Sequence, residues 1–161
     1  MLFKVAYTIV YGLAPYFQSA LLDTVKECDV YVACFDEALN KIAQRGQMDI
    51  VVRFWDLSKN VVSTRYLNSV FLRHATAKDL EQKFREGLLG IPEKNIVQVS
   101  MDGPSVNWKF LESLSESRDE GDCKLLDIGP CGLHVLMDSA NWPHCKWLVN
   151  QRILPCYLRV V

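Results

Sequence analysis

The pattern of apolar and polar residues predicts three strands in succession. The run Val30–Phe35 is apolar or nearly so without alternation, which is typical of a strand covered on both faces. Met48–Trp55 and Val61–Leu72 are rich in β-branched and aromatic residues and predict two more strands. The last of these is expected to be bent or bulged near Asn68. The three strands fit an antiparallel meander.

The pattern then changes to a helical period. Thr76, with Asp79 three residues later, resembles a capping box at the start of a helix. Leu80, Phe84 and Leu88 follow at helical spacing and predict the buried face of that helix.

A strand and a helix are predicted next. Asn95–Met101 is the expected strand. Ser105 is a candidate N-cap for a helix that runs through Leu114, with Phe110 and Leu111 on its buried stripe.

Lys124–Ile128 predicts a short fifth strand, and a further helix is expected from Cys131. The predicted order is therefore helix, β, β, β, α, β, α, β, α, in an α/β domain.

The first 22 residues are largely apolar, but glycine, proline and glutamine interrupt the run. This interruption argues against a membrane-spanning segment, and a cleaved signal peptide is the less favoured alternative. Leu13, Phe17, Ala20, Leu21 and Val25 recur at helical spacing. We therefore expect residues 1–27 to form an amphipathic helix packed on the core.

Length and composition indicate one globular domain. The chain has 161 residues, of which 50% are hydrophobic and 23% are charged. Its net charge of -1 shows none of the basic excess that is typical of nucleic-acid-binding proteins. The six cysteines are irregularly spaced, so reduced thiols and an intracellular setting are expected.

Two acidic residues follow apolar strands in the same way. Asp36 follows the first strand and Asp102 follows the fourth, where Gly-Pro then turns the chain into a helix. Three antiparallel strands followed by two strand–helix units is the layout of the ribonuclease H-like fold, in which the first and fourth strands are parallel neighbours. Because neighbouring strands lie under about 5 Å apart, the two acids could share Mg²⁺ or Mn²⁺. Glu37 is expected to face solvent, and turn or strand-end roles are the structural alternatives for both Asp residues.

Ordered blocks of the sequence resemble the core of hAT-superfamily transposases and their transposon-derived host relatives. The blocks are FDEALNK, QMDIVVRFWD, TRYLNSVFLRHATAKDL, QVSMDGPSVNWKFLE and CGLHVL. The likeness extends from about Tyr11 to about Leu136 and is densest around the two Asp-bearing strands.

This resemblance implies a ribonuclease H-like domain with a mixed five-stranded sheet and an acidic (DDE) triad. Asp36 and Asp102 match the first and second acids, and Cys131 and His134 match a family signature whose role is unknown. The family's third acid is a Glu beyond a large helical insertion, and the chain ends at Val161 before such an insertion. We therefore expect a truncated domain over 28–137, a divergent tail over 138–161 and no independent catalysis.

Other candidate ligands are weaker. Asp138 could substitute for the third acid but has no matching family position. A structural zinc needs four ligands. His144 and Cys145 would have to complete Cys131 and His134, yet adjacent residues rarely both point inward, so zinc is not expected.

The resemblance further implies a nuclear location. With near-neutral charge, DNA binding should be weak and non-specific. Docking on a related transposase-like protein, or weak Mg²⁺-dependent nuclease activity, are the alternatives. No membrane partner is expected, and the oligomeric state is open.

Overall fold

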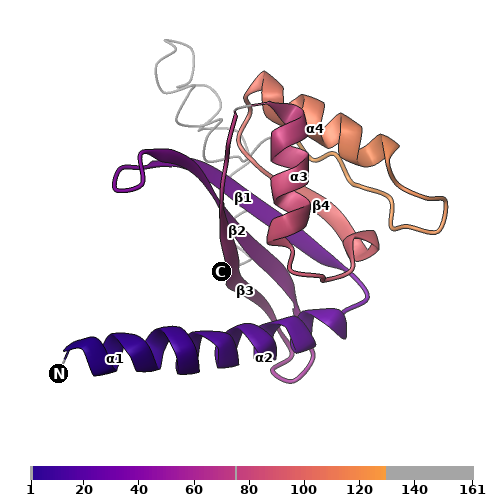
Figure 1. The fold of residues 1–161 in the computed structure, drawn as a ribbon. Helices are drawn as coiled ribbons and strands as arrows, with labels where there is room; N and C mark the ends of the chain where they lie inside the picture. Colours follow the sequence, from indigo (N-terminus) through magenta and orange to yellow (C-terminus); the bar gives the residue numbers. More distant parts are fainter. Residues whose placement is uncertain (1, 75, 130–161) are drawn as a thin grey trace, which may run out of the picture.

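The computed structural model describes residues 2–74 and 76–129. The elements are α1 Leu2–Thr8, the π-helical turn η1 Ile9–Leu13, α2 Ala14–Lys26, β1 Tyr31–Asn40, β2 Arg45–Asp56, β3 Val61–Phe71, α3 Ala77–Gly87, the 3-10 turn η2 Glu93–Asn95, β4 Ile96–Ser100 and α4 Ser105–Glu116. They form an α/β fold in which helices pack alongside a four-stranded mixed sheet (Figure 1).

The strand order is β3-β2-β1-β4. β1 pairs antiparallel with β2, and β2 pairs antiparallel with β3, which confirms the predicted meander. β1 also pairs with β4 in parallel, so the first and fourth strands are neighbours as predicted. β4 ends at Ser100 beside Cys34, in the middle of β1, which continues to Asn40.

The predicted fifth strand is not formed as such, and the sheet of the described residues has four strands. Cys123 N donates to Lys94 O at 2.9 Å and Leu126 N donates to Val97 O at 2.7 Å. The segment from Cys123 thus runs beside β4 in the same direction. Because these hydrogen bonds are three residues apart, they do not make a continuous ladder.

Arg118, just after α4, fastens this segment to the sheet. Its guanidinium donates to Ile96 O and Glu93 O, each at 2.9 Å, and also to Cys123 O. Its Nε has no hydrogen-bond partner among the described residues. One cation thus joins β4, η2 and the segment after α4.

The first two strands are longer than predicted. β1 continues past Phe35 to Asn40, and β2 already begins at Arg45, where the sequence predicted a turn. The turn lies between them because Asn40 Oδ1 accepts hydrogen bonds from Ile42 N and Ala43 N, at 3.0 and 2.9 Å. Asp36 and Glu37 therefore lie within β1 rather than after it.

The bulge near Asn68 is confirmed. Ile50 pairs with Asn68, whereas the next residue, Val51, pairs with Tyr66, so Leu67 is the extra residue in β3. Leu67 is buried. The other buried residues of β3 are Ser63 on one side of the register shift and Val70 on the other.

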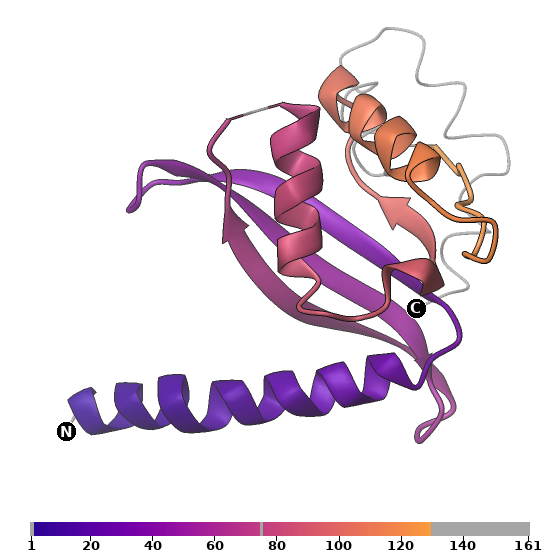
Figure 2. The ribbon, with the colours of Figure 1, turned by 45° about the vertical axis from the view of Figure 1, so that its right-hand side comes forward.

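Helices α3 and α4 cover one face of the sheet (Figures 1 and 2). The predicted cap of α3 is confirmed, since Thr76 Oγ1 accepts from Asp79 N at 3.2 Å. Between the helices and the sheet, Phe35, Phe84 and Phe110 pack with ring centroids 5.3 to 5.9 Å apart. This aromatic cluster is the centre of the core.

Burial alternates along β1. Tyr31, Ala33 and Phe35 are buried under the helices, whereas Val32 and Cys34 are partly exposed on the other face. The prediction that this strand is covered on both faces is therefore met only on the helix side.

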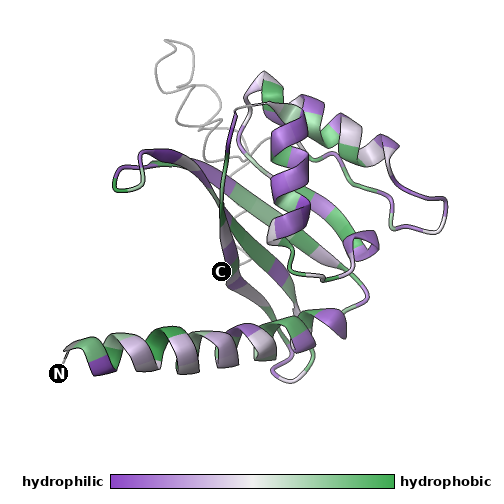
Figure 3. Ribbon diagram, in the orientation of Figure 1, coloured by the Kyte–Doolittle hydropathy of each residue, from purple (hydrophilic) through white to green (hydrophobic). Residues whose placement is uncertain are grey.

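The N-terminal helix runs continuously through α1, η1 and α2, and it projects beyond the sheet (Figures 1 and 2). Of the predicted stripe, Leu21 and Val25 pack on the core, but Leu13 and Phe17 are exposed. Apolar residues also occur on the projecting part, as Figure 3 shows. Packing on the core is thus confined to the last turns of α2.

The segment Phe3–Lys26, of 24 residues, is long and apolar enough to cross a membrane. Core helices of soluble proteins and signal sequences meet the same test, so the finding concerns length and composition only.

Candidate functional site

The acidic residues of β1 point to opposite faces of the sheet. Successive side chains of a strand alternate between faces, so Glu37 shares the face of Phe35 and Asp36 shares the face of Cys34. Glu37 is half-buried on the side covered by helices, and Asp36 is exposed on the other side. The prediction that Glu37 faces solvent is wrong, because β1 continues and keeps its alternation beyond Phe35.

Asp102 lies two residues after β4 and is half-buried. Asn107, in the first turn of α4, donates from Nδ2 to Asp102 Oδ1 at 2.6 Å. The Asn107 side chain is only 1% exposed and is also hydrogen-bonded to Glu37. One buried amide therefore joins Glu37 on β1 to Asp102 after β4.

The pKa of Glu37 is raised, first by its burial and then by the negative charge of Asp102. The hydrogen bond from Asn107 lowers the pKa of Glu37 in opposition, and Asp36 raises it further. We call Glu37, Asp102 and Asn107 the acid-amide cluster. Its electrostatics favour either a proton or a cation beside the two carboxylates.

Asp36 lies apart from this cluster on the other face of the sheet. In the β1–β2 register it stands opposite Asp49. Asp49 Oδ1 accepts hydrogen bonds from Gln47 Nε2 at 2.6 Å and from Ser69 Oγ. These donors on β2 and β3 offset the repulsion expected of like charges that face each other across two strands.

The pair Asp36 and Asp102 stays a predicted metal site. Carboxylate oxygens suit Mg²⁺ and Mn²⁺. Within residues 2–74 and 76–129, however, no group of three or more His, Cys, Asp or Glu side chains is arranged to hold a metal ion. Cys131 and His134, Asp138, and the adjacent pair His144 and Cys145 lie outside the described residues.

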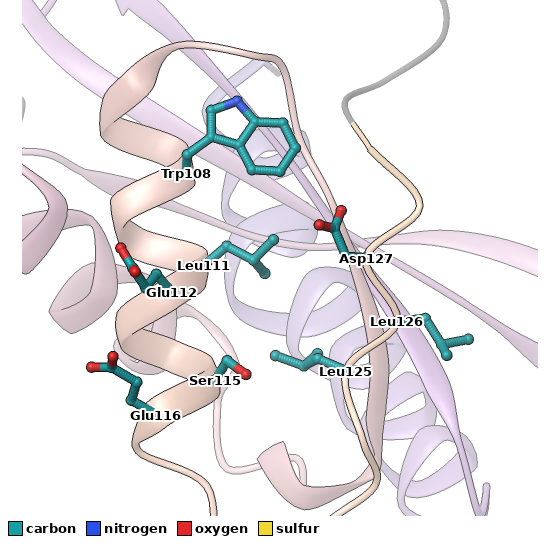
Figure 4. A pocket seen from close by; sticks show the side chains of 8 residues that line it. All are labelled: Trp108, Leu111, Glu112, Ser115, Glu116, Leu125, Leu126 and Asp127. Atoms are coloured by element: carbon teal, nitrogen blue, oxygen red, sulfur yellow. The ribbon is translucent and has the colours of Figure 1, made fainter.

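A surface groove lies between α4 and the segment that runs beside β4 (Figure 4). Trp108 and Leu111 point from α4 toward the segment that carries Leu125 and Asp127, and Glu112 and Glu116 also belong to the lining. An aromatic ring can stack on a nucleic-acid base, but three carboxylates would repel the phosphates of that strand. Trp108 is thus a partly exposed aromatic residue of a groove whose lining includes three acidic residues.

Asn107 was not predicted from the sequence, although the helical spacing of the apolar residues indicates that it is buried. Asn107 lies three residues before Phe110 and seven before Leu114, both fully buried. A polar residue at such a position on an apolar stripe is buried, and a buried amide needs partners. The nearby Asp102 was the available acceptor.

Comparison with known proteins adds no assignment. No family model matches the chain, and no curated protein matches it. The class that the structure defines is an α/β domain with a β3-β2-β1-β4 sheet and parallel β1 and β4.

Proposed function

We propose that the chain is a transposase-derived ribonuclease H-like domain without independent catalytic activity. Asp36 and Asp102 are the metal-binding acids of this proposal. The observation that supports this most is the parallel pairing of β1 and β4. In this register Ser100 at the end of β4 pairs with Cys34, so Asp36 and Asp102 each lie two residues beyond one paired position.

In this proposal Asp36 and Asp102 are the remains of a site for Mg²⁺ or Mn²⁺, and zinc has no role. The ion would supply an activated water and stabilise the leaving oxygen during DNA cleavage. Glu37 adds a carboxylate beside Asp102, and a bound cation would favour its ionised form. The exposed position of Asp36, on the other face from Glu37, supports a site that no longer holds two ions in place.

Weak, non-specific DNA binding and a nuclear location belong to the same proposal. Net charge is -1, and counterion release from DNA requires clustered Lys or Arg contacts to phosphate. The acidic groove around Trp108 supports weak rather than strong binding.

A plasmid-nicking assay with Mg²⁺ or Mn²⁺ tests this function. We expect no nicking above background by the wild-type chain. Mn²⁺-binding heat should be small, and it should disappear in the double variant Asp36→Asn, Asp102→Asn. Asp49→Asn is the matched control, because it removes a neighbouring acid outside the proposed site. Robust Mg²⁺-dependent nicking that Asp36→Asn abolishes would show an active nuclease and overturn the proposal.

Docking on a related transposase-like protein is the second candidate function. It is favoured by the projecting N-terminal helix, on which Phe3, Tyr11 and Tyr16 are each at least 68% exposed. Exposed apolar surface of this kind marks an interaction site. Co-sedimentation with a purified full-length transposase of this type would test it, and its absence would remove this candidate.

A further inference from the structure

We propose that two copies of the chain associate through an antiparallel pairing of their N-terminal helices, along a face that carries Lys4, Tyr7, Tyr11, Tyr16 and Asp23. We call this face the tyrosine face. The inference goes beyond the proposed function and does not depend on the acid-amide cluster.

The π-helical turn places Lys4 and Asp23 on the same side of the helix. Ala14 N donates to Ile9 O, five residues back, so η1 takes up about one residue more than an α-helical turn. Lys4 and Asp23 are 19 residues apart in the sequence. This separation corresponds to about 18 residues of α-helix, or about five complete turns.

The tyrosines lie between these two charges. The rings of Tyr7 and Tyr11 are in contact, with centroids 4.7 Å apart, so they share a side. Tyr16 lies at the same helical phase as Asp23, about two turns earlier along the helix. Tyr7, Tyr11 and Tyr16 are 67%, 69% and 68% exposed.

The tyrosine face points away from the body of the domain. Leu21, Leu22 and Val25 make the contacts of α2 with the core. By the same helical phase, Leu21 and Val25 lie about 160° around the helix from Asp23, and Leu22 lies about 100° from it. A second helix can therefore reach the tyrosine face without displacing a contact within the monomer.

An antiparallel pairing makes the charges complementary. Lys4 lies nine residues before Leu13, and Asp23 lies nine residues after Ala14. A pairing centred between Leu13 and Ala14 thus brings Lys4 of each copy to Asp23 of the other, twice by symmetry. Lys4 is also unfavourable beside the positive N-terminal end of its own helix dipole, and it would be favourable beside the C-terminal end of the second helix.

The available area is of the size that a dimer needs. Aromatic side chains bury roughly 150–250 Å² each when fully covered, and a standard interface takes about 800 Å² per partner. The three tyrosines and Phe3 beside them, each at least 67% exposed, provide area approaching this order. Tyrosine is also among the residues that contribute most to interfaces.

A lipid bilayer fits the helix less well than a second copy. In membrane-spanning helices tyrosine is found at the two membrane–water interfaces. Tyr11 and Tyr16 instead flank the middle of the segment Phe3–Lys26. Their hydroxyl groups would lie in hydrocarbon in a bilayer, but at a solvated rim between two protein helices.

Charge reversal tests the pairing in the full-length chain, by sedimentation velocity over a concentration series in detergent-free buffer. We expect wild type to form a dimer. Lys4→Glu alone and Asp23→Lys alone should each raise the dimer dissociation constant roughly tenfold, since each creates two like-charge contacts. An equimolar mixture of the two variants should restore association, because each Glu then meets a Lys.

Lys109→Glu is the matched control, since Lys109 is an exposed lysine on α4, away from the N-terminal helix (Figure 1). It should leave the dissociation constant unchanged. Restoration by mixing also shows that both variants are folded. A monomeric wild type, equal affinity in wild type and both variants, or no gain on mixing would each overturn the proposal. A monomeric wild type that floats with phosphatidylcholine vesicles would identify the helix as a membrane segment instead.

Discussion

Asn107 on α4 holds Asp102 with a 2.6 Å hydrogen bond from a side chain that is 1% exposed. The same amide is hydrogen-bonded to Glu37 on β1. It thereby links the helix, the turn after β4 and the strand that pairs with β4. A buried hydrogen bond to a charged group contributes more than one between neutral groups.

Replacing Asn107 with Ala should lower the free energy of unfolding by about 1–3 kcal/mol, since both carboxylates lose a donor in a partly buried place. Urea denaturation followed by circular dichroism measures this loss. Lys109→Ala, on the exposed side of the same helix, is the control and should change stability by no more than about 0.5 kcal/mol. Equal stability of the two variants would mean that the amide is not structurally important.

Glu37 should make stability depend on pH. Its pKa is raised above the ordinary 4.5, chiefly by burial, so the folded protein binds this proton more tightly than the unfolded chain. The free energy of unfolding therefore falls as pH rises from that ordinary value through the raised pKa. Glu37→Gln removes this pH dependence. As the pH rises through this range, the variant should therefore become more stable relative to wild type. Parallel pH profiles for the two proteins would contradict the assignment.

For Asp56 we expect stability to change with pH in the opposite direction to that for Glu37. Hydrogen bonds, the first of them from Ser58, and contacts with Lys59 lower its pKa from 3.8 to about 2. The contribution of Asp56 to the free energy of unfolding is thus present above pH 3.8, and it is lost as the pH falls toward about 2. Asp56→Asn should melt at a lower temperature than wild type at neutral pH, and the two should converge in acid. A constant difference at every pH would argue against this role.

The aromatic cluster should dominate stability. Phe84 is fully buried between Phe35 and Phe110, so Phe84→Ala should cost about 3–5 kcal/mol in free energy of unfolding. Phe17→Ala removes the same side chain from a position that is 64% exposed. Measured at a concentration where the chain is monomeric, this control should change stability by less than about 0.5 kcal/mol.

Gly87 at the end of α3 lies against the sheet. A Cβ there would overlap Ile50 Cδ1 and approach Val70 Cγ1 at 3.4 Å. Gly87→Ala should therefore destabilise by about 1–3 kcal/mol, although the same change in an open helix stabilises. Gly121→Ala, where no atom lies within 4 Å, is the control. A more stable Gly87→Ala variant would show that α3 can move away from the sheet.

The sequence predicted those elements whose signals are local. Thr76 and Asp79 specify the start of α3, and Leu80 and Phe84 specify its buried face, because caps and helical periods act within a few residues. The parallel neighbours β1 and β4 followed from chain topology rather than from any one residue. The prediction of a fifth strand was wrong, because the segment after α4 forms hydrogen bonds to β4 at only two positions.

The candidate site was harder to predict. Asp36 was expected to follow the first strand because the apolar run stops at Phe35, yet pairing with β2 extends that strand to Asn40. Tertiary pairing overrode composition there. The exposure of Phe17 could not be foreseen either, since a helical stripe shows that a surface is apolar but not what covers it.

Arg118 has a consequence for the order in which the chain folds. Its three carbonyl partners belong to η2, β4 and the segment after α4, and its charge cannot be removed by deprotonation. An arrangement without these contacts would leave a partly buried cation without its acceptors. We therefore expect β4, η2 and the following segment to open together as one cooperative unit when the Arg118 contacts are lost.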